Sequence, residues 1–70
     1  MQEVHKKLGK RVAELRRKRG FSQEEFAHEC TFNRSYMGAV ERGEKNITLA
    51  MTNKIAKALK MSLSELFKGV

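Results

Sequence analysis

The side chains in this sequence that can do chemistry are suited to binding, because the groupings that catalysis requires are missing. His5 and His28 have no partners at metal-ligand spacing, and no His, Cys or carboxylate constellation pairs a nucleophile with a base. Positive charge is abundant instead: 15 Lys and Arg stand against 8 Asp and Glu, which gives a net charge of +7. This excess predicts a polyanionic partner, and both nucleic acid and an acidic membrane qualify.

The length and composition predict a single soluble domain over residues 1–70. Pro is absent and helix-forming residues are common, which favours an all-α fold. Cys30 has no second cysteine to pair with, and the N-terminal segment lacks the apolar run of a secretory signal, so we expect a cytoplasmic location. A mean hydropathy of −0.60 disfavours the membrane as partner.

Two helices joined by a very short turn stand at the centre of the predicted fold. Ser22 and Glu25 form a capping box that begins a helix over residues 23–30. Residues 31–32 interrupt the helical pattern, and Asn33 is a good N-cap for a helix that runs to residue 42 and stops at Gly43. Its inward residues should be Met37 and Val40.

The remaining helices must support this pair. Apolar residues at helical spacing predict a first helix over 4–19, which ends at Gly20 and buries Val4, Leu8, Val12 and Leu15. Thr48 should cap a fourth helix, and Ser62 with Glu65 forms a capping box for a short fifth one. Five helices with the tightest turn between the second and third predict a helix-turn-helix.

The residues that form this turn also resemble a known family. The run SQEEFAHECTFNRSYMGAVERGEKNITL, the R-x-x-x-G before it and the closing A-L-x-M-S-L-S-E-L-F resemble the Cro and phage-repressor class, which is the Xre-like helix-turn-helix family. The resemblance covers about residues 8–67. Within that family, N-R-S-Y, V-E-R and N-I-T are similar to the controller proteins of restriction-modification systems. A five-helix, lambda-repressor-like DNA-binding domain is implied.

By this resemblance, the start of the third helix enters the major groove of double-stranded DNA. The implied base-contacting residues are Arg34, Ser35, Tyr36 and Ala39. Arg34 can form two hydrogen bonds with a guanine, whereas Ala39 can only touch a thymine methyl group. Two alternatives remain open: Arg34 is a solvated surface arginine, or Tyr36 completes the core.

The same resemblance assigns phosphate contacts to Gln23, Arg42, Lys45 and Asn46. For Gln23 the alternative is plain polarity at a helix start, and for Lys45 a solvated loop. Arg16 and Glu41 are expected to form a structural ion pair that orients the third helix. Losing one partner costs about 3–5 kcal/mol if the pair is buried, and the pair contributes under about 1 kcal/mol if it is exposed.

Two residues depart from the family pattern. Thr31 stands where the family commonly has Gly or Asn, because the turn takes a positive φ there, so we expect strain or a turn shifted by one residue. Gly38 lies inside the third helix, where it costs about 0.5–1 kcal/mol relative to Ala and permits the close approach of a backbone.

Together these features predict a transcriptional regulator that binds a pseudopalindromic operator as a homodimer. The expected dimer surface comprises Leu63, Leu66, Phe67 and Val70. No cofactor, metal ion, small-molecule ligand or membrane partner is expected. The alternative is a helix-turn-helix module that binds a protein, such as an antitoxin or a repressor subunit.

Overall fold

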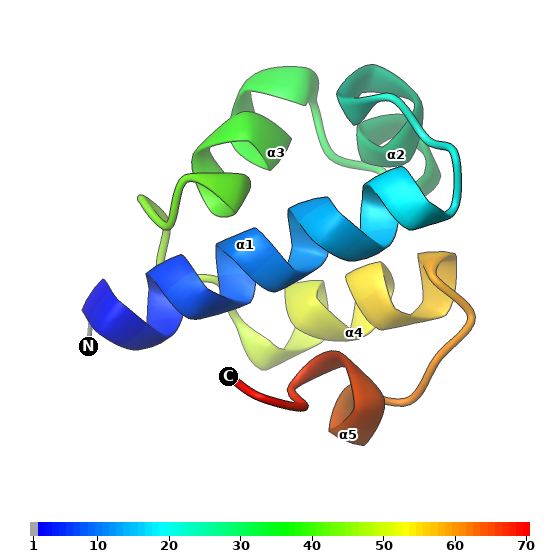
Figure 1. Ribbon diagram of the computed structural model, residues 1–70. Coiled ribbons are helices and arrows are strands. Elements are labelled where there is room, and N and C mark those ends of the chain that lie inside the picture. The colour runs from blue at the N-terminus through cyan, green and yellow to red at the C-terminus, as the bar shows by residue number, and fades with distance from the viewer. Residues whose placement is uncertain (1) are drawn as a thin grey trace.

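The computed structural model describes residues 2–70, which are all-α (Figure 1). Over this part of the chain there are five helices and no strand: α1 Gln2–Lys18, α2 Gln23–Glu29, α3 Arg34–Glu41, α4 Leu49–Ala58 and α5 Leu63–Leu66. Figure 1 shows α1 running between the α2–α3 pair on one side and the α4–α5 pair on the other. The predicted fold class is confirmed.

Local capping explains where four of the helices begin. The side chains of Ser22, Asn33, Thr48 and Ser62 each accept a hydrogen bond from the backbone N–H three residues further on. Each thereby satisfies one of the N–H groups that a helix start leaves without a partner. These are the caps that the sequence predicts, because a cap depends only on residues within one turn.

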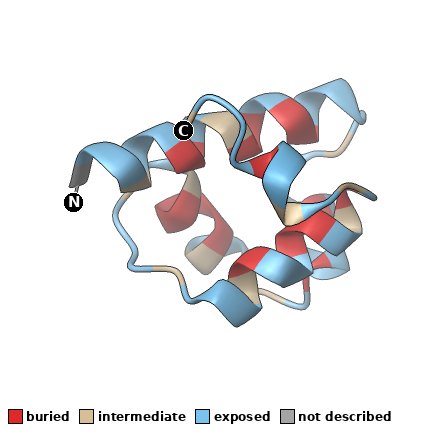
Figure 2. Ribbon diagram, turned by 90° about the horizontal axis from the view of Figure 1, so that it is seen from below, coloured by how far each residue is buried: buried red, intermediate tan, exposed pale blue. Residues whose placement is uncertain are grey.

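The core lies where the five helices meet, and Figure 2 shows the buried residues gathered on their inward faces. The largest fully buried side chains are Phe26, Met37, Ile55, Leu59, Leu66, Val12 and Cys30. The core requires one correction: Val4, predicted to be buried, is 51% exposed because it lies near the free N-terminal end of α1.

A second correction concerns Leu66, which was expected in the dimer surface but is fully buried in the core. The reason is that α5 has only four residues and directs a single side chain inward. Arg11 of α1 holds this short helix in place, because its guanidinium donates to the carbonyls of Glu65 at 2.8 Å and Leu66 at 3.2 Å. Those carbonyls lie in the last turn of α5, where helical hydrogen bonding ends, and the carbonyl of Glu65 also accepts from the N–H of Lys68 at 3.2 Å.

Candidate nucleic-acid interface

The corner between α2 and α3 directs the start of α3 away from the core. After the C-cap Cys30, Thr31 adopts a φ of 60° and the N–H of Phe32 donates to the carbonyl of Ala27 at 2.8 Å. Asn33 then turns extended, with φ −83° and ψ 163°, and caps α3. The positive φ therefore occurs at Thr31 itself, so the turn is not shifted by a residue, and a β-branched side chain bears the unfavourable conformation.

Arg16 and Glu41 form the predicted ion pair, and it is buried. The guanidinium of Arg16 donates to both carboxylate oxygens, at 2.8 and 3.2 Å, and the two side chains are 10% and 7% exposed. Arg16 also donates to the carbonyl of Phe21 at 2.9 Å, and the amide of Gln23 donates to Glu41 at 3.0 Å. This network joins α1, the start of α2 and the end of α3.

Four polar side chains surround a shallow hollow at the outer face of α2 and α3. Gln23, Arg34, Ser35 and Arg42 line it, Gly38 forms its floor, and its volume is about 300 Å³. Arg34 and Ser35 are exposed. The structure thus brings two of the expected base contacts, Arg34 and Ser35, next to two of the expected phosphate contacts, Gln23 and Arg42.

The other two expected base contacts lie elsewhere. Tyr36 packs edge-on against Phe32, with ring centroids 4.9 Å apart, and its hydroxyl donates to the sulfur of Met51 at 2.9 Å. This geometry fits the alternative in which Tyr36 completes the core. Ala39 is only 6% exposed, and the N–H of Glu44 donates to its carbonyl at 2.9 Å, which holds the following loop against it. A thymine contact needs an exposed methyl group, which Ala39 does not offer.

The loop after α3 carries the remaining expected phosphate contacts. Arg42 and Asn46 line one hollow together with Lys6, while Lys45 is exposed to solvent. Arg42 is already engaged, because it donates to the carboxylate of Glu44 at 3.0 and 3.2 Å. The hydrogen bond and charge of Arg42 hold the pKa of the Glu44 carboxyl below its usual value, so Glu44 is ionised at neutral pH.

Comparison with known proteins decides the family. The sequence matches the helix-turn-helix family over residues 12–66, which is most of the chain. This protein belongs to the helix-turn-helix family. Membership confirms the predicted class, a sequence-specific DNA-binding transcriptional regulator rather than an enzyme.

Several relatives of the helix-turn-helix chain are named as control proteins. It is 34% identical to control protein C.MunI of Mycoplasma sp over 100% of its own length and 96% of that protein. Identity to control protein C.BamHI of Bacillus amyloliquefaciens is 42%, over 74% of this chain and 65% of that one. The crystal structure of the restriction-modification controller protein C.AhdI from Aeromonas hydrophila is similar with a TM-score of 0.88 and 42% identity, covering 93% of this chain and 94% of the other.

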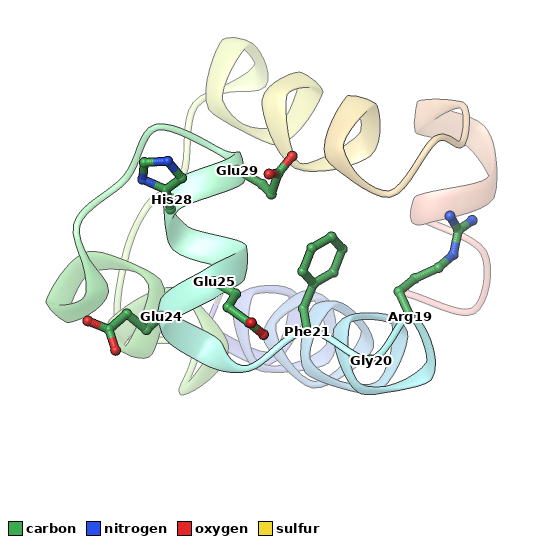
Figure 3. Close-up of a pocket in the computed structure, with 7 residues that line it drawn as sticks. All are labelled: Arg19, Gly20, Phe21, Glu24, Glu25, His28 and Glu29. Atoms are coloured by element: carbon green, nitrogen blue, oxygen red, sulfur yellow. The ribbon is translucent and has the colours of Figure 1, made fainter.

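A different hollow in this helix-turn-helix domain is unsuited to DNA. It lies between the end of α1 and the outer side of α2, and Figure 3 shows Glu24, Glu25 and Glu29 around it together with His28 and Phe21. Three carboxylates repel phosphate groups, so this face is the wrong one for a polyanion. Glu25 also caps α2, because the N–H of Ser22 donates to its carboxylate at 2.9 Å and lowers the pKa of that carboxyl.

Sequence reasoning missed two features of the interface. Gly9 allows α1 to pack against the end of α3 so closely that a Cβ there would lie 2.4 Å from the carbonyl oxygen of Val40. Glu44 competes for Arg42. The first depends on tertiary contact and leaves no local signal, whereas the second has one: opposite charges two residues apart in a tight loop.

Two other kinds of feature are absent from residues 2–70. No helix within residues 2–70 has the length and apolar character needed to cross a bilayer. Nor do His, Cys, Asp and Glu residues in that part of the chain gather into a group of three that would hold a metal ion.

Proposed function

We propose that this protein regulates transcription by binding a pseudopalindromic operator in double-stranded DNA as a homodimer. The observation that carries the proposal is the placement of Arg34 and Ser35, which stand exposed on the first turn of α3 beside Gln23 and Arg42. An arginine at the start of such a helix can bind guanine through two hydrogen bonds in the major groove. The buried pair of Arg16 and Glu41 fixes the direction in which α3 points.

Size supports the homodimer. The domain measures 28 × 23 × 21 Å, which is less than one turn of DNA, about 34 Å. One copy therefore spans a single half-site, and two copies related by two-fold symmetry read two half-sites one turn apart. Of the expected dimer surface, Phe67 is 36% exposed, and Leu63 and Val70 are half-buried against the core. We propose that these three residues form the contact between copies.

The dimer contact is tested by sedimentation equilibrium at tens of micromolar protein. Phe67→Glu should give a monomer, because a charge placed in an apolar contact loses its solvation. Leu49→Glu is the matched control, since Leu49 is 69% exposed on α4, outside the proposed contact. A monomeric wild type refutes the dimer, and a monomer only with Leu49→Glu places the contact on α4.

Operator binding is tested by selecting bound duplexes from a random pool. The selected sequences should contain a palindrome with half-sites about one turn apart, and affinity should fall steeply as salt rises. Arg34→Ala should relax the preference at one guanine position. If Arg34→Ala weakens binding to all duplexes equally, Arg34 contacts a phosphate; if alanine at positions 34 and 35 changes no DNA binding, the protein-binding alternative holds.

We further propose that the genes under control are those of a restriction-modification system, and that the protein acts in the cytoplasm with no cofactor. Support comes from the similarity to C.MunI and C.AhdI over nearly the whole of each chain. The test is a reporter driven by the promoter of any restriction gene found beside the gene for this protein. Expression that does not respond to the protein contradicts this assignment without affecting the DNA-binding proposal.

A further inference from the structure

We propose that Gly38 is the point at which α3 comes closest to DNA, and that a backbone phosphate lies over its missing side chain. The inference rests on the proposed DNA-binding function. It adds a positioning residue, one that makes no specific hydrogen bond but sets how deeply α3 enters the groove.

The fold does not require a glycine at this position. Gly38 has an ordinary helical backbone within α3, where glycine is less favourable than alanine because it loses more backbone freedom. A Cβ built on Gly38 would meet only the ends of two flexible side chains, at 3.1 Å from Nη1 of Arg42 and 3.5 Å from Oε1 of Gln23. No backbone atom stands in its way.

At Gly9 and Gly43, by contrast, close backbone packing does require a glycine. A Cβ on Gly9 would lie 2.4 Å from the carbonyl oxygen of Val40, and one on Gly43 would lie 2.7 Å from Cα of Lys6. Both contacts are with backbone, so both glycines are needed for the helices and loops to pack. Packing within the domain therefore does not explain the glycine at position 38, and we infer that a ligand approaching the face of α3 does.

The surroundings of Gly38 indicate an anion. The four side chains around it are Gln23, Arg34, Ser35 and Arg42, which offer two guanidinium groups, an amide and a hydroxyl. No carboxylate lines this hollow, in contrast to the three glutamates around the hollow on the outer side of α2. Guanidinium, amide and hydroxyl groups around one hollow suit the oxygens of a phosphate group.

The position of Gly38 between these donors explains why a phosphate can come so close. Gln23 and Arg42 stand on either side of it: the amide N–H of Gln23 donates to Glu41 in the buried network, whereas Arg42 is held only by the exposed Glu44 and can turn toward a phosphate. In the free protein their ends cover Gly38, which is buried beneath them. A phosphate held by Arg42 would lie against the bare backbone of α3, and any side chain at position 38 would push the helix out of the groove.

The test compares Gly38→Ala and Gly38→Leu with wild type on the operator selected from the random pool. Gly38→Ala should not melt below wild type, because alanine favours a helix more than glycine does and its Cβ meets only the flexible end of Arg42. The melting temperature of Gly38→Leu is measured alongside, so that a folding defect is not read as lost affinity. Operator affinity should fall with side-chain size, modestly for alanine and at least about tenfold for leucine. If the rigidity of α3 mattered rather than the bulk of the side chain, the two variants would lose the same amount of operator affinity. That result overturns the proposal.

Double variants separate a direct clash with DNA from displacement of Arg42. In an Arg42→Ala background, Gly38→Leu should still lower affinity, because the phosphate and not the guanidinium is what it strikes. If the effect disappears in that background, Gly38 acts only through Arg42 and the proposal is wrong. Phosphate ethylation interference gives a second readout: ethylation of the phosphate over Gly38 should block wild type and have a smaller effect on Gly38→Leu, which has already lost that contact.

The outcomes of the test distinguish this inference from the proposed function. If wild type selects no operator, the DNA-binding proposal fails first. If wild type selects an operator and the Gly38→Leu variant binds it equally well, only the inference about Gly38 fails. Gly9→Ala serves as the control for added bulk at a structural glycine, and it should lower the melting temperature, which Gly38→Ala does not.

Discussion

Arg16 and Glu41 face each other across the α1–α3 contact, joined by hydrogen bonds of 2.8 and 3.2 Å, and their side chains are 10% and 7% exposed. The amide of Gln23 completes the network from α2 at 3.0 Å. All groups in this network are paired, which is the condition under which a buried charge is tolerated. The direction of α3 is therefore tied to α1 by a buried ion pair.

Removing one partner of this pair should be costly. Glu41→Gln leaves the guanidinium of Arg16 buried without its counter-charge, and we expect a loss of about 3–5 kcal/mol in the free energy of unfolding. Urea unfolding followed by circular dichroism measures it. Glu44→Gln is the control, because that carboxylate sits in an exposed pair and its loss should change stability little. A loss under about 1 kcal/mol for Glu41→Gln would mean that the pair behaves like a surface pair.

Gly9→Ala should destabilise the domain by separating α1 from α3. The added methyl group would lie 2.4 and 2.6 Å from the carbonyl oxygens of Val40 and Glu41, so the backbone must move. Overpacking of this kind costs about 1–3 kcal/mol. Thermal unfolding of the variant measures the loss. An unchanged melting temperature would show that the two helices can separate freely at this point.

Thr31→Gly should stabilise the corner between α2 and α3. Thr31 has a φ of 60°, a conformation that costs an L-residue about 1–2 kcal/mol and glycine very little. The gain is partly offset by the greater freedom of glycine in the unfolded chain, so we expect a net rise of about 0.5–1 kcal/mol in unfolding free energy. Thr31→Ala is the control, since alanine keeps the strain; an equal rise with alanine would refute strain as the cause.

Cys30 should be unreactive in the folded protein. Burial raises the pKa of its thiol to about 12, and only the thiolate is nucleophilic. A thiol reagent at pH 8 should label the chain only after unfolding. Because the folded pKa is raised, the contribution to stability is complete below pH 9 and is lost between pH 9 and 12, so wild type should lose more stability than Cys30→Ala over that range. Rapid labelling of native protein would contradict this.

Glu44→Gln should strengthen DNA binding. Glu44 is ionised at neutral pH and occupies the guanidinium of Arg42, which we propose as a phosphate contact. The substitution releases Arg42 and removes a negative charge from the loop, so affinity should rise severalfold and depend more steeply on salt. Titration of a labelled operator at several salt concentrations measures both. In an Arg42→Ala background most of the gain should vanish, and a gain that persists would assign it to charge alone.

Most of the fold was predictable because the residues that begin and end its helices act locally. Each N-cap depends on residues within one turn, and these predictions hold. The positive φ at Thr31 was implied only by the family resemblance, and it is present. Burial was less predictable: Val4 follows the apolar stripe of α1 and is exposed, whereas Leu66, which helical spacing places inward, was also expected in the dimer surface and is fully buried. Helical spacing identifies a face but does not say how far the neighbouring helices extend along it.

The residues of the candidate site were also predictable only in part. Arg34, Ser35, Gln23 and Arg42 converge, because they lie on one side of a motif whose corner the sequence specifies. Ala39 and Tyr36 do not join them, since a returning loop covers one and Met51 of α4 binds the hydroxyl of the other. Both partners come from outside the motif, so no pattern within it indicates them.

Two arginines of α1 together set how α5 and α3 are placed relative to each other. Arg11 holds α5 and Arg16 holds α3, five residues apart on one rigid helix, which is about 7.5 Å of helix rise. α1 thus fixes the separation between α5, which carries the proposed dimer contact, and α3, which carries the proposed DNA contact. A single residue inserted between these arginines would turn one about 100° relative to the other, so α5 and α3 could not both keep their contacts with α1.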